Sequence, residues 1–373
     1  MKVSHFGRGA ALLSVTALAL TACGGDDNGN GDDNGNGENG EVNAEEVQGT
    51  LEGGGASSQE SAMTEWNQQF LEVAPNAQVN YNPVGSGGGR EGLLGGQYDF
   101  AGSDAAMDDE EWEDSKEVCG DEGAFHIPSY ITPIAVAYNV DGIEDGLQLD
   151  ADTLAQIFSG EITSWDDDAI AEQNEDLDLP STSITVVHRA DDSGTTENFT
   201  EYLETASDSW DEEPSGDWPS DFSAESAQQT SGVVSLASET DGAITYADAG
   251  QIGDLNSVNV RVGEEYVEYS PEAAATAVER SPQAEGQAEN DMAFDLDRET
   301  TEEGAYPIVM VAYNIFCNEY SDQEKVDLVK AYGEYIVSED GQNAASDAAG
   351  SAPMSEDLRS EAEEAFSQIS AAE

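Results

Sequence analysis

The chain has 373 residues, of which 80 are acidic and 11 are basic, and its formal net charge at pH 7 is −69. A surface this negative argues against nucleic acid and anionic membrane as binding partners. The length allows one large domain or two smaller ones, each with its own core. The acidic residues are spread among apolar and aromatic runs, which is typical of a folded protein and not of a disordered acidic tail.

The charge predicts that stability depends on salt. Self-repulsion at a net charge of −69 strains a compact fold in dilute buffer. Molar salt shortens the range of that repulsion to about 3 Å. We therefore expect a halophilic protein whose melting temperature rises between low and molar salt. Thermal unfolding across a series of salt concentrations measures this, and equal stability at both extremes would contradict it.

The N-terminus predicts an export signal with a lipid attachment site. Lys2 and Arg8 accompany an apolar run at residues 10–20, which is too short to span a bilayer comfortably. The run ends in Leu-Thr-Ala-Cys, which resembles the lipobox of bacterial lipoproteins, where the cysteine is lipidated and becomes the first mature residue. We expect residues 1–22 to be a lipoprotein signal peptide and Cys23 to carry the lipid. An ordinary secretory signal, or a cysteine there by chance, is the alternative.

Residues 23–46 are predicted to form a disordered tether. Between residues 24 and 41 the chain has no apolar and no basic residue, so it has nothing to bury and its charges repel one another. A lipid at one end and a folded body at the other suit a protein that works just outside a cell membrane.

The body begins with three strand–loop–helix units, which predict an α/β fold with a largely parallel sheet. In the first unit, Met63, Trp66, Phe70 and Val73 are spaced to line one helix face. Ligands of such sheets bind outside the carboxyl ends of the strands, where the loops lie. The units are residues 46–75, 77–96 and 98–112.

Two apolar runs, at residues 126–140 and 306–316, both contain Val-Ala-Tyr-Asn and predict buried strands. We interpret them as paired crossovers between two lobes. The first lobe would comprise residues 47–131 and 309–373, and the second lobe residues 132–308. The alternative is two central strands of one continuous sheet.

The remaining segments predict further elements of both lobes. Residues 153–167 indicate a helix that leads into a turn with a tryptophan, and residues 232–250 indicate a helix followed by a strand. Residues 208–221 and 281–291 are polar and predict loops. Residues 324–354 begin as an amphipathic helix and are expected to end in a tail of small residues.

The segment 188–199 predicts an anion clamp. Residues 193–196, Ser-Gly-Thr-Thr, precede a predicted helix, where unpaired backbone N–H groups and the helix dipole favour negative charge. Arg189 can supply a bidentate fork to an oxyanion, and Asp191 can hold that fork in place. The alternative is a plain helix cap with a turn, beside a surface ion pair.

Similar loops recur elsewhere in the chain. Residues 53–58, 85–89 and 191–196 each combine glycine with hydroxyl residues before a helix, and Ser103 and Asp104 follow a strand in the same way. Three helix N-termini, neutral donors and one arginine could surround a small tetrahedral anion, and glycines let the backbone approach its oxygens.

The order and the sequences of these motifs resemble those of the phosphate-binding lipoprotein of the bacterial phosphate ABC importer. The resemblance covers residues 47 to 320 and implies a two-lobed, periplasmic-binding-protein-like (type II) fold with a hinge between the lobes. The first loop departs from the Thr-Phe-Pro of many members, because it reads Ser57-Ser58-Gln59. The matching segments are GASSQ (55–59), VGSGGGR (84–90), DFAGSDAAM (99–107), LAQIFSGEITSWDD (154–167), ITVVHRADDSGTT (184–196) and GAITYADA (242–249).

The resemblance also implies which residues hold the phosphate. Asp104 is the unusual member, since a carboxylate repels an anion unless that anion has a proton to donate. Phosphate has a P–OH group that an ionised carboxylate can accept, whereas sulfate has none. Without the resemblance, Asp104 reads as a helix cap or turn residue. The implied phosphate-binding residues are Ser57, Ser58, Ser86, Asp104, Arg189, Asp191, Ser193, Gly194 and Thr195.

The implied function is a binding protein without cofactor or metal. It would capture inorganic phosphate between the lobes and deliver it to the permease subunits of an ABC importer, as a monomer anchored to the outer face of the membrane only by its lipid. A binding protein for sulfate or molybdate is one alternative. A secreted phosphatase is another, but His188, Asp191 and Ser193 are crowded onto one strand and loop, which disfavours a catalytic triad.

Two cysteines remain after the lipobox, Cys119 and Cys317. An exported compartment permits a disulfide between them, and two buried free thiols are the alternative. The chain has no Cys-x-x-Cys, no His-Glu-x-x-His and no cluster of its three histidines, so its sequence does not support a metal site.

Overall fold

The computed structural model describes residues 43–143, 146–279, 281–284 and 286–372. The predicted signal peptide (1–22), Cys23 and most of the predicted tether lie outside the described residues. None of the described helices combines the length and the apolar composition that a membrane crossing requires.

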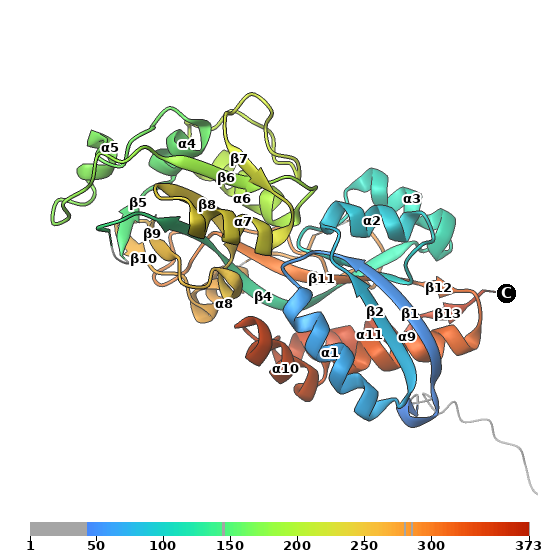
Figure 1. Cartoon of the computed structure of the whole chain (residues 1–373). Coiled ribbons are helices and arrows are strands. Elements are labelled where there is room, and N and C mark those ends of the chain that lie inside the picture. The colour runs from blue at the N-terminus through green and yellow to red at the C-terminus, as the bar shows by residue number, and fades with distance from the viewer. Residues whose placement is uncertain (1–42, 144–145, 280, 285, 373) are drawn as a thin grey trace, which may run out of the picture. The chain divides into compact units, whose positions relative to one another are not determined.

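The first lobe is built from the three predicted strand–loop–helix units and from helices at the end of the chain (Figure 1). Strand β1 pairs in parallel with β2 and with β3, so the carboxyl ends of these strands meet at one edge of the sheet. The elements of this part are η1 (Ala44–Glu46), β1 (Gln48–Gly55), α1 (Glu60–Val73), β2 (Asn76–Asn82), α2 (Ser86–Leu94), β3 (Phe100–Ser103) and α3 (Asp109–Cys119).

Helix α1 buries the predicted apolar face except at its end. Met63, Trp66 and Phe70 are each at most 1% exposed. The expectation for Val73 is wrong, because this side chain is 38% exposed. Val73 is the last residue of α1, and the chain turns there through the buried Ala74 toward β2.

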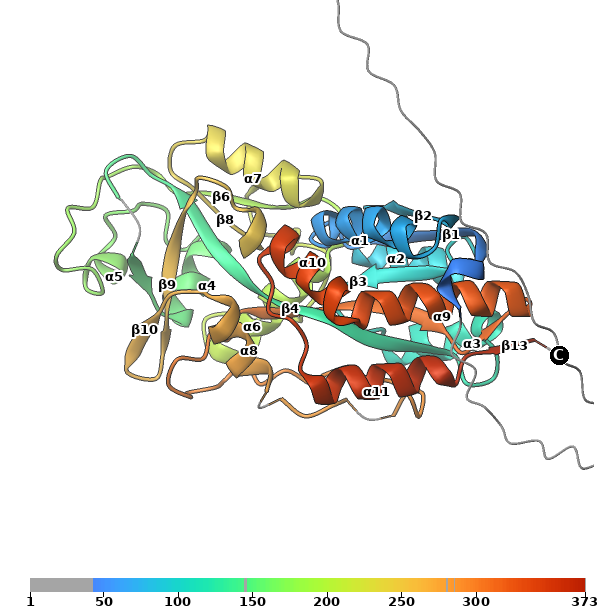
Figure 2. The same cartoon turned by 90° about the horizontal axis from the view of Figure 1, so that it is seen from below.

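Strand β4 (Ala124–Asn139) links the two lobes (Figure 2). It pairs with β11 (Val309–Cys317) up to Pro133, and from Ile134 onward it pairs with β8 (Ala243–Asp248). Both apolar runs are buried, as predicted. Strand β11 pairs with β3 and with the part of β4 up to Pro133, so the second crossing is made by the residues just before β11.

The sheet is mixed and not largely parallel, which corrects the prediction. One path of strands runs β2-β1-β3-β11-β4-β8-β6-β7, so β4 and β11 are also central strands of one continuous sheet. Strand β11 is antiparallel to both of its neighbours because it returns to the first lobe in the direction opposite to β4. The division of the chain at residues 131 and 308 stays a prediction.

The second lobe places β6 between β7 and β8, with all three strands parallel. The predicted helix and tryptophan turn are α4 and the buried Trp165, and the predicted helix and strand are α7 and β8. Residues 208–221 form loops, as expected. The other elements are β5 (Leu147–Leu149), α4 (Ala151–Ser159), α5 (Asp168–Ala171), β6 (Thr185–Arg189), α6 (Gly194–Ala206), β7 (Glu225–Ala227), α7 (Gln229–Glu239), η2 (Ala249–Gln251), β9 (Asn256–Val262), β10 (Glu265–Val267) and α8 (Pro271–Val278).

The C-terminal segment is helical further than predicted. After α9 (Gln323–Val337), the expected tail of small residues forms α10 (Glu339–Ala349), whose first turn Ser338 caps by accepting from the Gly341 N–H. Small residues let α10 pack closely on α1, and the indole of Trp66 donates to the Gly341 carbonyl at 2.7 Å. The chain closes with α11 (Glu356–Ser367) and a small sheet of β12 (Glu319–Tyr320) and β13 (Ser370–Ala371).

A disulfide joins Cys119, at the end of α3, to Cys317, at the end of β11. It ties two parts of the first lobe that are 198 residues apart in the sequence.

Candidate functional site

Asp104 lies where the two lobes meet, in the loop after β3, and is 3% exposed. The hydroxyl of Ser58, just before α1, donates to its carboxylate oxygens at 2.8 and 2.6 Å. Thr195, in the first turn of α6, donates to the same carboxylate at 3.2 Å. Because Ser58 belongs to the first lobe and Thr195 to the second, one buried carboxylate connects both lobes.

Three further hydroxyl groups each accept a backbone hydrogen bond. Ser57 Oγ accepts from the Thr230 N–H at 3.1 Å, Ser86 Oγ accepts from the Asp104 N–H at 3.1 Å, and Ser193 Oγ accepts from the Thr196 N–H at 3.2 Å. A hydroxyl whose oxygen accepts in this way keeps its own proton to donate. Ser57 also lies 3.1 Å from the Thr230 hydroxyl, and either group can donate to the other. The arrangement suits an acceptor placed among these groups.

Arg189, the last residue of β6, is 4% exposed and is held by Asp191. Its Nε donates to Asp191 Oδ1 at 2.9 Å, and its Nη2 pairs with the other carboxylate oxygen. These bonds leave Nη1 for a ligand. Burial raises the pKa of Asp191, but the hydrogen bonds and charge of Arg189 outweigh it, so the pKa lies below its ordinary value. Asp191 is therefore ionised and fixes the guanidinium.

Close approach of the lobes depends on glycine at two positions. A Cβ on Gly194 would lie 2.6 Å from Ser86 Oγ and 2.9 Å from Asp104 Cβ. Gly85 has a φ of 95°, and a Cβ there would lie 2.4 Å from the carbonyl oxygen of Asp192. Contacts this short leave no room for a side chain, so the structure is that of a closed cleft.

Burial dominates the electrostatics of Asp104. Loss of solvent raises the pKa of its carboxyl group above the ordinary value, while the hydrogen bond from Ser58 and the positive charge of Arg189 oppose this shift. The carboxylate therefore depends on its donors and on the nearby guanidinium to stay ionised.

The structure brings the nine predicted residues together. It also tests the alternative interpretations of the 188–199 segment and of Asp104. Ser193 does cap α6, as the plain reading expected, but the pair of Arg189 and Asp191 is buried and not on the surface. Asp104 is not a helix cap, since Asp108 caps α3. Whether the nine residues hold an anion stays a prediction.

Sequence reasoning missed several residues that position Asp104. Asn198 donates to the Asp104 carbonyl at 2.7 Å and to the Gly194 carbonyl at 2.8 Å. Arg298 in turn binds Asn198 and donates to Glu201 at 2.7 Å. Both line a cavity of about 240 Å³ that reaches Asp104. Asn198 lies within the predicted segment 188–199. Arg298 lies in no predicted motif, and the one feature of the sequence that could have drawn attention to it is that basic residues are scarce in this chain.

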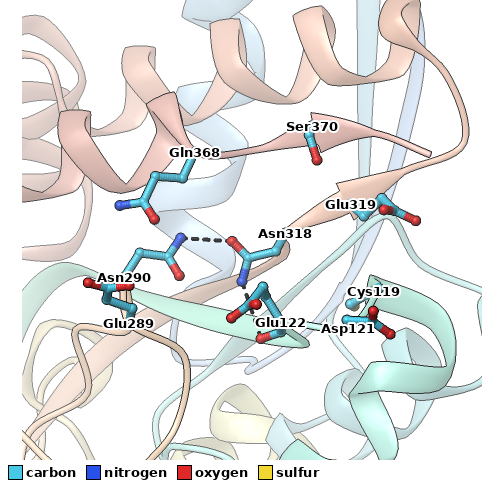
Figure 3. Close-up of a pocket in the computed structure, with 10 residues that line it drawn as sticks. Cys119, Asp121, Glu122, Glu289, Asn290, Asn318, Glu319, Gln368 and Ser370 are labelled. Carbon is cyan, nitrogen blue, oxygen red and sulfur yellow. Dashed lines mark hydrogen bonds between the residues drawn. The ribbon is translucent and has the colours of Figure 1, made fainter. Parts of the chain in front are cut away.

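A larger pocket of about 380 Å³ lies elsewhere, beside Cys119 (Figure 3). There Asn290 donates to Asn318 at 2.9 Å, and Asp121, Glu122, Glu289 and Glu319 also line the pocket. Carboxylates repel an anion, and none of the nine predicted residues lies there. Among the residues that the structure describes, no group of three or more His, Cys, Asp or Glu side chains is arranged to hold a metal ion.

Comparison with known proteins gives related sequences over most of the chain. Residues 41–340 match the family model of the PBP superfamily domain. The chain is 34% identical to the phosphate-binding protein PstS 3 of Mycobacterium tuberculosis over 342 residues, which cover 89% of this chain and 90% of that protein. It is 32% identical over 379 residues to PstS 2 of the same species, covering 99% of this chain and 100% of that protein.

Solved structures share the fold. The phosphate-binding protein from Stenotrophomonas maltophilia has a TM-score of 0.64 at 21% identity, covering 85% of this chain and 94% of that one. The periplasmic phosphate-binding protein PfluDING, bound with phosphate, has a TM-score of 0.63 at 20% identity, covering 83% and 92%. These likenesses confirm the predicted two-lobed, periplasmic-binding-protein-like fold. The chain thus belongs to the PBP superfamily and, within it, to the PstS phosphate-binding proteins.

Proposed function

We propose that this protein captures inorganic phosphate between its two lobes and delivers it to the permease of a phosphate ABC importer. The observation that carries the proposal is the buried carboxylate of Asp104 among hydroxyl donors from both lobes, beside the braced guanidinium of Arg189. The relatives named phosphate-binding proteins support the same ligand.

The carboxylate favours phosphate over sulfate and molybdate. A phosphate that still has a proton donates its P–OH to Asp104 in a charge-assisted hydrogen bond. A fully ionised oxyanion has no such proton, so its oxygen faces the carboxylate unpaired and repelled. A buried polar group left without its hydrogen bond can reduce affinity strongly.

Titration calorimetry with phosphate and with sulfate, both in molar salt, tests the proposal. We expect one phosphate per chain and a sulfate affinity lower by about a hundredfold or more. Equal affinities, or a preference for sulfate or molybdate, would contradict the assignment of the ligand.

The negative surface is compatible with capture of an anion. In molar salt, long-range repulsion is screened within about 3 Å, whereas hydrogen-bond donors and helix dipoles inside a closed cleft act at contact distance. Capture is therefore expected to be stronger in molar salt than in dilute buffer.

Gly194→Ala is expected to weaken phosphate binding by about tenfold or more. The added methyl group would lie 2.6 Å from Ser86 Oγ, so the lobes must stay apart and the donors of α6 no longer reach the ligand. Alanine suits a helix, so the melting temperature should not fall. Calorimetry and thermal unfolding measure both effects.

Gly232→Ala is the matched control, because its Cβ would make an ordinary contact of 3.4 Å with Ala227 Cβ. Unchanged phosphate affinity in Gly194→Ala would show that closure does not bring α6 against Ser86.

Binding is favoured over phosphatase activity by the position of His188. Its Nδ1 lies 2.6 Å from the Arg189 carbonyl oxygen, and its ring stacks on Trp218 with 5.1 Å between centroids. Ser193 instead accepts from the Thr196 N–H, so no general base is paired with its hydroxyl in the described contacts. Incubation with a chromogenic phosphate ester should release no product.

The proposal extends to the place where the protein works. The lipobox at Cys23 and the acidic tether support a monomer held outside the membrane by its lipid alone. The intact mass of the membrane-extracted protein tests the anchor, since a mature chain that begins at a lipidated Cys23 is expected. An unmodified N-terminus would contradict it.

A further inference from the structure

Asp248 is a buried carboxyl group that the proposed ligand site does not use. It is the last residue of β8, pairs with Ile134 of β4 and is 0% exposed. Its Oδ1 accepts from the Gly250 N–H at 2.9 Å. Its Oδ2 is buried without a hydrogen-bond partner among the described residues. A carboxyl group in such a place is stable only as the neutral acid or with a compensating partner.

Two hydroxyl groups of β4 share this situation. Tyr130 Oη and Thr132 Oγ1 are also buried without a partner among the described residues. Burial raises the pKa of Asp248 to about 8, and the negative charge of Asp104 adds to the shift, while the nearby Thr132 side chain and the Gly250 N–H oppose it. Burial likewise raises the pKa of Tyr130, with contributions from Asp248 and Asp104. We call Asp104, Tyr130, Thr132 and Asp248 the rear cluster.

The rear cluster is joined to the donors of the ligand site. Gln251, three residues after Asp248, donates from its side chain to the Ser58 carbonyl at 2.7 Å. Ser58 in turn donates to the Asp104 carboxylate. Gly250 lies against the end of α10, where a Cβ would be 2.0 Å from the Ala349 carbonyl oxygen. The segment that follows Asp248 thus contacts the first lobe directly behind the site.

We propose that Asp248 is a positioning residue of the phosphate site that acts as the neutral acid. In that form it can donate a proton within the rear cluster, and it adds no further negative charge behind Asp104. Phosphate binding and protonation of Asp248 then favour each other. The inference rests on the proposed function and adds a proton-linked residue to it.

The direction of the effect follows from the charges around Asp248. Asp104, from the loop after β3, raises the pKa of Asp248, whereas Thr132 of β4 and the Gly250 N–H lower it. Arg189, the cation of the site, is paired with Asp191. Bound phosphate adds negative charge, so it raises the cost of ionising Asp248. Because the pKa in the folded protein is raised to about 8, phosphate affinity should fall as the pH rises through that value.

The test compares the wild type with Asp248→Asn, which is neutral at every pH and keeps an oxygen for the Gly250 N–H. Phosphate affinities of both proteins are measured by calorimetry at about pH 6.5 and about pH 9.5. At each pH the affinity of the wild type is divided by that of the variant, which cancels the titration of phosphate itself. We expect the wild type to match the variant at the lower pH and to bind about tenfold more weakly at the higher pH. Asp241→Asn, an exposed residue just before β8, should keep the wild-type pH profile.

A ratio that does not change with pH would overturn the inference and leave phosphate binding intact. Failure of the wild type to bind phosphate at any pH would instead overturn the proposed function, and the inference with it. If Asp248→Asn does not fold, infrared difference spectra of the wild type replace it. Phosphate should increase the absorption of protonated carboxyl groups near pH 8, and no increase would overturn the inference.

Discussion

Replacing Asp104 by asparagine is expected to remove most of the preference for phosphate over sulfate. The carboxylate accepts hydrogen bonds from Ser58 and Thr195, and its remaining capacity suits the P–OH of a protonated phosphate. The asparagine amide cannot accept on both atoms, and its NH₂ group can donate to a fully ionised oxyanion. Phosphate affinity should fall and sulfate affinity should rise, so that the ratio changes by about a hundredfold.

Competition calorimetry with both anions in molar salt measures this ratio. Asp121→Asn, an exposed residue beside the large acidic pocket, is the matched control and should leave the ratio unchanged. If Asp104→Asn keeps the wild-type affinities for both anions, Asp104 has no part in selecting the ligand.

Local sequence patterns predicted the elements of the first lobe well. Alternation, helical spacing and glycine loops occur within each strand–loop–helix unit, so β1 to α3 could be placed without knowledge of the rest. The pairing of β11 could not be predicted in this way. Its neighbours β3 and β4 are far away in the sequence, and the direction of β11 depends on the path that the chain takes between β4 and β11. Helix α10 was missed because its small residues are favoured by close packing on α1, which is a tertiary contact.

The candidate site divides in the same way. Arg189, Asp191, Ser193 and Thr195 are neighbours in the sequence, so their chemistry could be recognised together. Ser57 and Ser58, in contrast, are held by residues from elsewhere in the chain. Thr230, the second residue of α7, donates its N–H to Ser57, and Gln251, which follows β8, donates to the Ser58 carbonyl. Nothing in a short polar helix start distinguishes Thr230 from an ordinary cap, and its role becomes visible only through its contact with Ser57.

The distribution of the few positive charges connects the fold to the site. Among the residues that the structure describes, three arginines are buried, and each binds a residue of the candidate site or one that contacts it. Arg90 donates to Ser103 at 3.1 Å, Arg189 binds Asp191, and Arg298 binds Asn198. A chain with so large an excess of acid thus keeps buried guanidinium groups where the lobes meet, which offsets the cost of burying carboxylates there.

Arg189→Lys is expected to weaken phosphate binding by about a hundredfold, although the charge is kept. The guanidinium uses Nε and Nη2 to bind Asp191 and still has Nη1 for the ligand. A lysine ammonium is a single point, so it cannot hold Asp191 in this way and reach the anion in a fixed geometry as well. Asp191 would then be a half-buried carboxylate with a weaker partner, so the melting temperature should fall modestly too.

The matched control is Arg261→Lys, because Arg261 is exposed and lies 4.0 Å from Asp150 at the surface. It should change neither the affinity nor the melting temperature. Calorimetry with phosphate shows whether Arg189 acts through its charge alone or through the geometry of its guanidinium. If charge alone held the ligand, Arg189→Lys would bind almost as well as the wild type. A large loss of phosphate affinity is expected instead, because Asp191 holds the planar guanidinium of Arg189 in the orientation that binds phosphate.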